Sequence, residues 1–223
     1  MDVDHLALDL AVTIRHDGHD GIADGLAESA GLTAWVREHA LALAGHGFTV
    51  SGGEFTADEA ALGAVVTVRT AVRALFGRAV LPGPPSAADA GRLPSAEESL
   101  HRLNAASALV PVVPRLDWLP ETAPTARCAV PGPLAAPAAP TADRLAAALA
   151  RAAIAFLAGP DREKLRACPA PRCVRYFVKQ HALQEWCKPS CGNRARVARH
   201  HARRRAAVPA VADRPGPTPS GLG

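Results

Sequence analysis

The sequence has few aromatic residues and very few lysines. Phe, Trp and Tyr make up 4% of the 223 residues, although 48% of the chain is hydrophobic, much of it alanine. This composition excludes a core built on large rings, and we expect helices packed closely through Leu, Val and Ala. Only three of the 25 cationic residues are lysine. That bias also matches a GC-rich genome, so the choice of arginine does not by itself indicate guanidinium-specific recognition.

The sequence predicts neither a signal peptide nor a membrane span. Asp2 and Asp4 stand where a signal peptide needs a basic start, and no long apolar run follows them. No stretch reaches the ~18–20 uninterrupted apolar residues of a spanning helix. We therefore expect a cytoplasmic protein that has no membrane partner.

The sequence shows no nucleophile motif or phosphate-binding loop, and this argues against an enzyme. Histidines and aspartates are dense near the N-terminus, at His5, Asp9, His16, His19 and Asp20. The HDGHD segment (16–20) has the density of a metal site, but it is Gly-rich and no partner pair can be placed elsewhere. A solvated polar loop is the favoured interpretation.

Charge is distributed very unevenly along the chain. Between Arg162 and Arg205 there are 13 Lys and Arg residues and two acidic residues, Glu163 and Glu185. This segment carries about +11, so the remainder carries about −7 of the total of +4. An acidic body with a strongly basic C-terminal module is the expected organisation.

Helical patterns dominate the first two thirds of the chain. The apolar segment 6–15 fits either a strand or a buried helix, and 17–25 is typical of a loop. Thr33 is predicted to cap a helix that runs to about Leu43, with Trp35, Val36 and Leu41 on its apolar face. Gly45 and Gly47 would end it.

A longer helix is predicted from Thr56 to about residue 80. It has acids in its first turn and arginines toward its end, as the helix dipole favours. An apolar stripe runs along it, formed by Leu62, Val65, Val66, Val72, Leu75 and Phe76. The Pro-rich segment 81–86 breaks the pattern. A second helix is predicted from Ser95 to about Leu109, with Ser95 and Glu98 in a capping-box arrangement.

Two short extended segments follow, within 111–130, and predict a small two-stranded hairpin. An Ala/Pro linker (131–140) leads to a helix over 141–157, which Gly159-Pro160 stops. Cys128 lies far from the other cysteines and is interpreted as a small buried apolar residue. The Pro/Gly-rich segment 206–223 is predicted to be disordered.

The most informative pattern is a cluster of four cysteines near the C-terminus. Cys168, Cys173, Cys187 and Cys191 have the spacing Cys-x4-Cys, thirteen residues, then Cys-x3-Cys. Clustered cysteines in a reducing compartment indicate metal ligands, and two close pairs suit one tetrahedral Zn²⁺ with a structural role. An iron–sulfur cluster uses the same ligands and is the chemical alternative. His181 can substitute for one cysteine, although a surface loop residue is the favoured interpretation.

The segment between the cysteine pairs predicts a treble-clef-like finger. Residues 174–178 alternate and favour a strand, with 184–186 as the returning strand of a hairpin. A helix would follow from about 192 to 207 and begin beside the last ligand. Its alanine stripe (Ala195, Ala198 and Ala202) is expected to pack on the aromatic residues of the finger, Tyr176, Phe177 and Trp186.

The exposed surface of that helix is predicted to be almost wholly cationic. Its arginines include Arg194, Arg196, Arg199, Arg203, Arg204 and Arg205, with His200 and His201 between them. Such a surface is typical of phosphate-backbone binding. A solvated basic helix, or one that docks on the acidic body of the chain, is the alternative. A charged surface supplies affinity, and no base contact can be assigned from it.

These residues resemble a known family. Trp186 and the run Cys187-Lys-Pro-Ser-Cys191-Gly-Asn-Arg194 resemble the signature of the CGNR zinc finger. Upstream segments are similar to its N-terminal partner, the ABATE domain: Leu6-Ala-Leu-Asp9 with Thr13, Leu32-Thr-Ala-Trp35, 65–75, Leu103-Asn104 and Pro114-Arg-Leu-Asp-Trp118. The resemblance extends to about Arg205. It implies a stress-linked transcription regulator with one zinc bound by the four cysteines.

The signature residues themselves have structural interpretations. Gly192 would let the backbone approach the thiolates, Asn193 would cap or bond the adjacent turn, and Arg194 would offset the negative charge of a zinc–tetrathiolate site. One departure from the family pattern is Val12, which stands where the family usually has Asn before Thr13.

The expected protein is mainly α-helical. We predict an ABATE-like helical domain with a small β-hairpin (1–130), a linker (131–140), a connecting helix (141–160), a zinc finger with a basic helix (161–206) and a disordered tail (207–223). The predicted function is a zinc-dependent DNA-binding transcription regulator, in which Arg194, Arg196, Arg199, Arg203 and Arg204 contact nucleic acid. The N-terminal domain would sense a small-molecule effector or form a homodimer. The alternative is a protein-interaction module whose finger docks on a partner protein, without nucleic acid.

Overall fold

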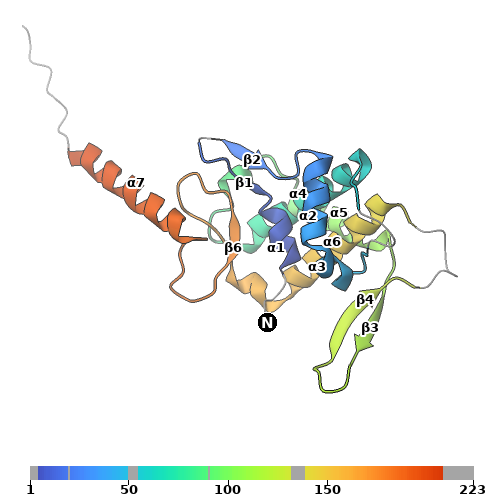
Figure 1. Ribbon diagram of the computed structural model, residues 1–223. Helices are drawn as coiled ribbons and strands as arrows, with labels where there is room; N and C mark the ends of the chain where they lie inside the picture. Colours follow the sequence, from blue (N-terminus) through green and yellow to red (C-terminus); the bar gives the residue numbers. More distant parts are fainter. Residues whose placement is uncertain (1–4, 20, 50–54, 90, 132–138, 208–223) are drawn as a thin grey trace, which may run out of the picture.

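The computed structural model describes residues 5–19, 21–49, 55–89, 91–131 and 139–207. Helices form a compact body, from which a β-hairpin and the C-terminal helix extend (Figure 1). The prediction of a mainly α-helical fold with small β-hairpins and a C-terminal cysteine cluster is confirmed. The linker segment 132–138 and the tail 208–223 lie outside the described residues.

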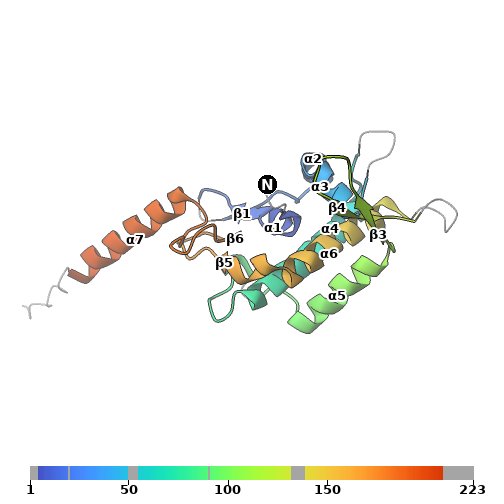
Figure 2. The same cartoon turned by 90° about the horizontal axis from the view of Figure 1, so that it is seen from below.

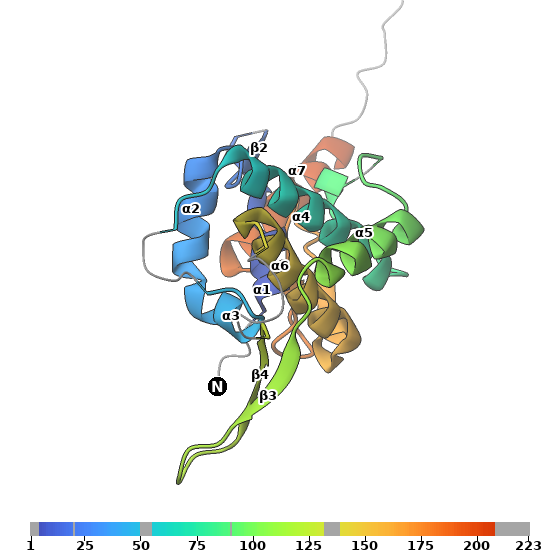
Figure 3. The ribbon, with the colours of Figure 1, turned by 90° about the vertical axis from the view of Figure 1, so that its right-hand side faces the viewer.

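Two long helices, α4 (Glu59–Ala79) and α6 (Thr141–Ala158), pack against each other at the centre of the body. Helix α5 (Ala96–Ala108) packs on both of them. Helices α2 (Ser29–Glu38) and α3 (Ala40–Gly45) lie on the opposite side of the body from α5 (Figure 3). The short helix α1 (Leu6–Ala11) contacts α4 and α6.

The core of this body is aliphatic with a few aromatic rings. Eight alanines and leucines of α6 are buried, from Leu145 to Ala153. They face the predicted stripe of α4, where Leu62, Val65, Val72, Leu75 and Phe76 are buried and Val66 is half-buried. Small side chains on α6 let the helices approach closely, as the alanine content indicates. The aromatic rings are few but central, since Phe76 packs against Phe156 and Tyr176.

Helix α4 begins two to three residues later than Thr56. Asp58 is its N-cap, and the Asp58 carboxylate accepts a hydrogen bond of 2.7 Å from the Ala61 N–H. A carboxylate in this position satisfies one of the free N–H groups and complements the helix dipole. Helix α5 begins as predicted, because Ser95 Oγ accepts the Glu98 N–H at 3.1 Å. Glu98 does not complete a capping box; its side chain pairs with Arg102 instead.

The N-terminal segment divides into a helix and a strand. Residues 6–11 form α1, and β1 (Ile14–His16) then pairs antiparallel with β2 (Ile22–Asp24). The loop predicted over 17–25 is therefore wrong for residues 22–24. Only three residues pair on each side, which is too few for an alternating sequence pattern to be recognised.

The predicted cap and apolar face of the next helix are also corrected. Helix α2 starts at Ser29, so Thr33 lies inside it, where its hydroxyl donates to Ser29 O and accepts the Ala57 N–H. Leu41 is 90% exposed, whereas Leu43 is fully buried. The break between α2 and α3 at His39 rotates the second helix, and a single continuous helix could not predict this rotation.

The predicted hairpin within 111–130 is confirmed. Strands β3 (Val113–Asp117) and β4 (Thr125–Ala129) pair antiparallel and project from the body (Figure 3). Cys128 lies in β4 and is half-buried, so the prediction of a buried residue is wrong. The hairpin stands clear of the core, and this position leaves one face of β4 partly open.

The C-terminal third starts with a 3₁₀ turn (Pro160–Lys164) and continues into β5 (Leu165–Ala167), β6 (Tyr176–Val178) and α7 (Pro189–Ala207). Strand β6 pairs antiparallel with β5, with Leu165 opposite Val178. The predicted pairing of this strand with 184–186 is wrong. The Gln184 side chain is engaged locally, since it accepts the Gln180 N–H and donates to Trp186 O.

One described helix, α4, is long and apolar enough to cross a membrane by length and composition alone. Its apolar side chains instead pack against α1, α2, α5 and α6. It also carries two buried arginines, Arg69 and Arg73, each of which is paired with a carboxylate. These features are those of a core helix.

Candidate metal centre and basic helix

The four predicted cysteines converge on one point. Their sulfur atoms all lie within 4.8 Å of one another, and this is the one such group of metal-ligating side chains found among the described residues. Cys187 Sγ lies 3.7 Å from Cys173 Sγ and 3.5 Å from Cys191 Sγ, and Cys173 and Cys191 are 3.8 Å apart. A tetrahedral Zn²⁺ with Zn–S bonds of about 2.3 Å places its sulfurs ~3.8 Å apart. The donor set therefore fits one zinc ion.

Backbone N–H groups around the sulfurs hold the first pair of ligands. The N–H groups of Ala170 and Cys187 bond the Cys168 sulfur, and the Arg175 N–H bonds the Cys173 sulfur. Ala170 and Arg175 each lie two residues after a cysteine, so both turns wrap around their ligand in the same way. Arg172, just before Cys173, takes φ +64°, which closes this tight turn. All five cysteines are free of disulfides.

The thiols cannot all ionise without a cation. Hydrogen bonds from the Cys173 and Cys187 thiols lower the pKa of Cys168 to about 2. The hydrogen bond to Cys168 raises the pKa of Cys173 to about 11, and contacts with Cys168 and Cys173 raise the pKa of Cys187. One of the thiols ionises readily, and the negative charge of this thiolate then disfavours the ionisation of a second thiol. A divalent cation that binds sulfur removes this opposition, which is the role of a structural zinc.

A small second cluster of buried residues surrounds the sulfurs. Phe177, Ala170 and the half-buried Trp186 pack around the ligands. Gly192 is required beside Trp186, because a Cβ on this residue would lie 2.9 Å from Trp186 Cδ1. The glycine of the signature therefore makes room for the indole ring, which differs from its predicted approach to the thiolates.

The two residues after Gly192 also have visible partners. Arg194 Nη2 donates to Cys191 Sγ at 3.3 Å, in agreement with the role expected for this arginine. A guanidinium here offsets part of the net charge of about −2 of a zinc–tetrathiolate centre. Asn193 Oδ1 accepts a hydrogen bond from Arg196, so of its two predicted roles Asn193 bonds the adjacent turn of the helix.

Helix α7 begins at Pro189, three residues before the predicted start, and contains the last ligand in its first turn. It then extends away from the rest of the molecule (Figures 1 and 2). Ala195 is buried, but Ala198 is half-buried and Ala202 is exposed. The prediction that the whole alanine stripe packs on the finger is therefore wrong beyond the second turn. The exposed cationic residues are Arg196, Arg199, Arg203, Arg204 and Arg205.

Comparison with known families assigns both parts of the chain. Residues 4–160 match the ABATE family, described as "Putative stress-induced transcription regulator", and residues 164–204 match the CGNR zinc finger. The chain belongs to the ABATE family. Its C-terminal segment is a CGNR zinc finger, and this match supports zinc binding by the cluster of four cysteines. No curated protein matches the chain.

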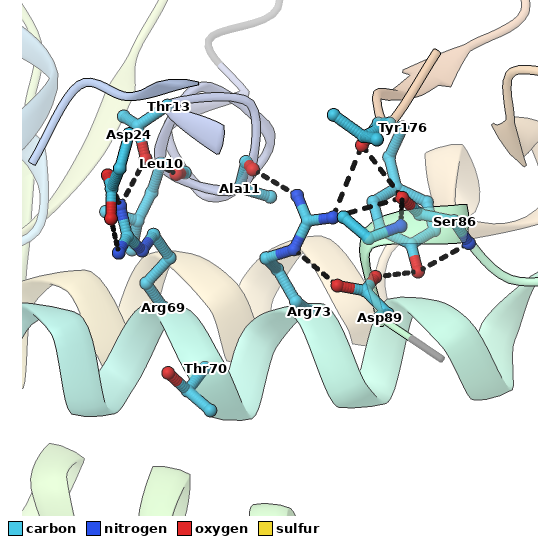
Figure 4. Close-up of polar contacts among 12 residues, drawn as sticks. Leu10, Ala11, Thr13, Asp24, Arg69, Thr70, Arg73, Ser86, Asp89 and Tyr176 are labelled. Carbon is cyan, nitrogen blue, oxygen red and sulfur yellow. Dashed lines mark hydrogen bonds and ion pairs between the residues drawn. The ribbon is translucent and has the colours of Figure 1, made fainter. Parts of the chain in front are cut away.

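The CGNR finger is connected to the ABATE body through a buried arginine of α4. Arg73 is 1% exposed, and its Nε donates to Asp89 Oδ1 at 2.8 Å. Its Nη1 donates to Ala11 O at 2.6 Å (Figure 4). Its Nη2 donates to Val174 O at 3.2 Å. One guanidinium therefore joins α1, the turn that contains Asp89 and the segment after the second zinc ligand.

Tyr176 reinforces the same connection from the finger side. Its hydroxyl donates to Asp89 Oδ2 at 2.6 Å and accepts the Ser86 N–H at 3.3 Å. Its ring lies 5.3 Å from the Arg73 guanidinium carbon and packs against Phe76. Burial and the Asp89 carboxylate raise the pKa of Tyr176, so the phenol stays neutral and donates. Tyr176 thus belongs to the core of the body and does not pack against α7 as predicted.

A second arginine of α4 ties down the N-terminal hairpin. Arg69 is buried and donates to both carboxylate oxygens of Asp24, and to Thr13 Oγ1 at 3.0 Å (Figure 4). Thr13 in turn donates to Leu10 O, so Val12 precedes a threonine that is already fully engaged. Arg78 lies in the last turn of α4, where the helix dipole favours it, whereas Arg69 and Arg73 form buried ion pairs. Their buried roles could have been suspected from their i,i+4 spacing beside the apolar stripe.

The histidines and aspartates near the N-terminus do not converge. His5 lies 3.5 Å from Asp161, and Asp9 lies 3.8 Å from His39. His19 is exposed, and Asp20 lies outside the described residues. His181, the alternative zinc ligand, is exposed in the loop between the cysteine pairs. Within the described part of the chain, none of these residues belongs to a group of side chains that could hold a metal ion.

Proposed function

We propose that the protein is a DNA-binding transcription regulator in which α7 of the CGNR finger contacts the duplex. The observation that carries the proposal is a cationic helix that projects free of the body. Beyond Ala195, all its arginines are exposed, and the helix extends away from the body (Figure 1). At 1.5 Å per residue, its 19 residues span about 28 Å. An α-helix is narrow enough to enter the major groove of B-DNA.

The charge of α7 supports nucleic acid over a protein partner. The helix contains no acidic residue, and Val197 is its one large aliphatic side chain. Protein interfaces are usually depleted of charge at their centre and enriched in apolar and aromatic anchors. Phosphates, in contrast, are bound by exposed Arg side chains with release of counterions. Arg194 is the exception among the predicted contacts, because it is already engaged with Cys191.

In this proposal, the ABATE body supplies regulation and not catalysis. It holds the finger through the Arg73 and Tyr176 contacts, so a change in the body is transmitted to the position of α7. Sensing of a small molecule and dimerisation are the two roles proposed for it. Five free cysteines and a thiolate metal site suit the reducing cytoplasm.

The proposal is tested with zinc-loaded full-length protein and a fluorescent duplex of mixed sequence. We expect saturable binding at low salt that is strongly weakened in the variant Arg196→Gln/Arg199→Gln/Arg203→Gln. The matched control removes the same charge from exposed positions of the body, Arg78→Gln/Arg92→Gln/Arg115→Gln. Equal loss in both variants, or no binding by the wild type at low salt, would contradict the proposal. A nuclease-resistant pull-down of a protein by the finger would then favour the protein-interaction function.

A further inference from the structure

A cavity lies between the N-terminal hairpin and the zinc finger. It measures about 440 Å³, within the range of small-molecule sites. Arg15 and His16 of β1 line one side of it, and Cys173 and Arg175 of the finger line another. Lys188, Ser190 and Arg194 complete it at the start of α7. The site therefore exists only where the body and the finger meet.

The lining of this cavity is strongly cationic. Arg15, Arg175, Lys188 and Arg194 contribute four positive charges, and no carboxylate lines it. In the described part of the chain, no acidic side chain pairs with Arg15, Arg175 or Lys188. The zinc–tetrathiolate centre beside Cys173 offsets about two of these charges. A net positive charge remains, and it is concentrated by the concave shape of the cavity.

Two buried hydrogen-bond donors of the lining have no partner in the described structure. The Gly18 N–H donates to His16 Nδ1 at 2.9 Å, so in the neutral ring the proton is on Nε2. His16 Nε2 is buried and has no acceptor. The same is true of Arg194 Nε, although Arg194 Nη2 is engaged with Cys191. Buried donors without acceptors are uncommon, and here both belong to residues that line the cavity, although the two atoms themselves are closed to solvent.

Helix geometry adds to the preference for an anion. Ser190 lies in the first turn of α7, a helix of 19 residues, so the positive end of the helix dipole is at the cavity. Donors then reach the cavity from three directions: the hairpin, the finger turn and the helix start. A tetrahedral oxyanion has acceptor oxygens that can meet such a set at once.

We propose that this cavity binds a phosphoryl group. A phosphate monoester carries close to two negative charges at pH 7 and three oxygens that accept hydrogen bonds, matching the four cationic side chains that line the cavity. The volume exceeds that of a phosphate ion, so part of the attached organic group fits inside. The proposal does not depend on DNA binding by α7, because Arg15, Arg175 and Lys188 all lie outside that helix.

The test is a ³¹P NMR titration of zinc-loaded full-length protein with inorganic phosphate, at constant ionic strength set by chloride. We expect saturable broadening and shift of the phosphate signal. The variant Arg15→Gln/Arg175→Gln should bind phosphate about tenfold more weakly or worse. Lys188→Gln, at an exposed position, should weaken binding without affecting the fold. Zinc content and circular dichroism verify that each variant is folded.

The variant Arg199→Gln/Arg203→Gln, whose changes lie on α7 away from the cavity, is the matched control and should bind phosphate normally. No saturable binding by the wild type, or equal weakening in the control, would overturn the proposal. A duplex-binding assay then identifies the source of the phosphoryl group. If Arg15→Gln/Arg175→Gln also weakens the duplex and phosphate competes with it, the group is a DNA phosphate. If duplex affinity is unchanged, the ligand is a free phosphorylated compound.

Discussion

At the scale of single residues, Arg73 matters most for the position of the finger. It is buried and donates to Asp89, Ala11 O and Val174 O. Removing one partner of a buried ion pair leaves an unpaired charge, which costs about 3–5 kcal/mol. We therefore expect Arg73→Met to lower the free energy of unfolding by that amount in urea denaturation.

The control for this prediction is the double variant Arg73→Met/Asp89→Asn, which removes both charges. It should recover part of the lost stability, because no uncompensated carboxylate remains. Equal stability of the wild type and Arg73→Met would show that the ion pair does not support the fold.

Cysteine substitutions separate the zinc ligands from the remaining thiol. Cys187→Ser removes a ligand whose sulfur lies within 3.7 Å of two others, and we expect it to lose zinc to a competing chelator that the wild type resists. Cys128→Ser is the matched control, since Cys128 lies in β4 and outside the cluster. Elemental analysis after dialysis measures both. Retention of one zinc per chain in Cys187→Ser would contradict the four-cysteine site.

Residue patterns predicted the zinc ligands but not the buried polar contacts. Two close pairs of cysteines are typical ligands of one zinc ion, so the four zinc ligands could be predicted from their spacing in the sequence. Arg73, Asp89 and Tyr176 lie on separate elements and meet only after α4, the 3₁₀ turn Ala87–Asp89 and β6 are assembled. Their pairing depends on tertiary packing, which local periodicity does not contain.

At the scale of elements, α7 has an unusual balance of forces. Only its start is buried, and Arg199 and Arg203 are like charges at i,i+4, an arrangement that weakens a helix. Arg199→Glu converts this into a favourable Glu–Arg pair. We expect slower amide hydrogen exchange in α7 together with weaker DNA binding.

Arg204→Glu is the control for this change. It alters the charge equally, but no arginine lies four residues from it on either side. It should weaken DNA binding without slowing hydrogen exchange in α7. Slower exchange in both variants would show that net charge, and not the i,i+4 pair, limits the helix.

Elements with long, periodic patterns were predicted best. Helices α4, α5 and α6 and the β3–β4 hairpin were located from the sequence, with boundary errors of a few residues at α4. The pairs β1–β2 and β5–β6 were not, because three-residue strands carry too little pattern. The strand that pairs with β6 is β5, which precedes Cys168. The predicted partner, 184–186, lies after β6, beyond the loop between the two cysteine pairs.

At the scale of the whole molecule, the finger and the body share one core. Leu165, Tyr176 and Val178 of the β5–β6 pair belong to the same buried cluster as α4 and α6. The domain boundaries inferred from the sequence remain a prediction. Since the shared core couples the two parts, we expect zinc release and loss of helical circular dichroism to follow the same curve in urea. Zinc release at clearly lower urea would show that the finger unfolds separately.

The salt dependence of DNA binding distinguishes an α7 that contacts DNA phosphates from one that is merely basic. Each neutralised phosphate contributes about −0.9 to the slope of log K against log salt concentration. Compared with zinc-loaded wild type, Arg196→Gln/Arg199→Gln/Arg203→Gln should show a slope shallower by about 2.7, whereas the body control Arg78→Gln/Arg92→Gln/Arg115→Gln should keep the wild-type slope. An unchanged slope in the α7 variant, or an equal reduction in both, would contradict a DNA-binding role for α7.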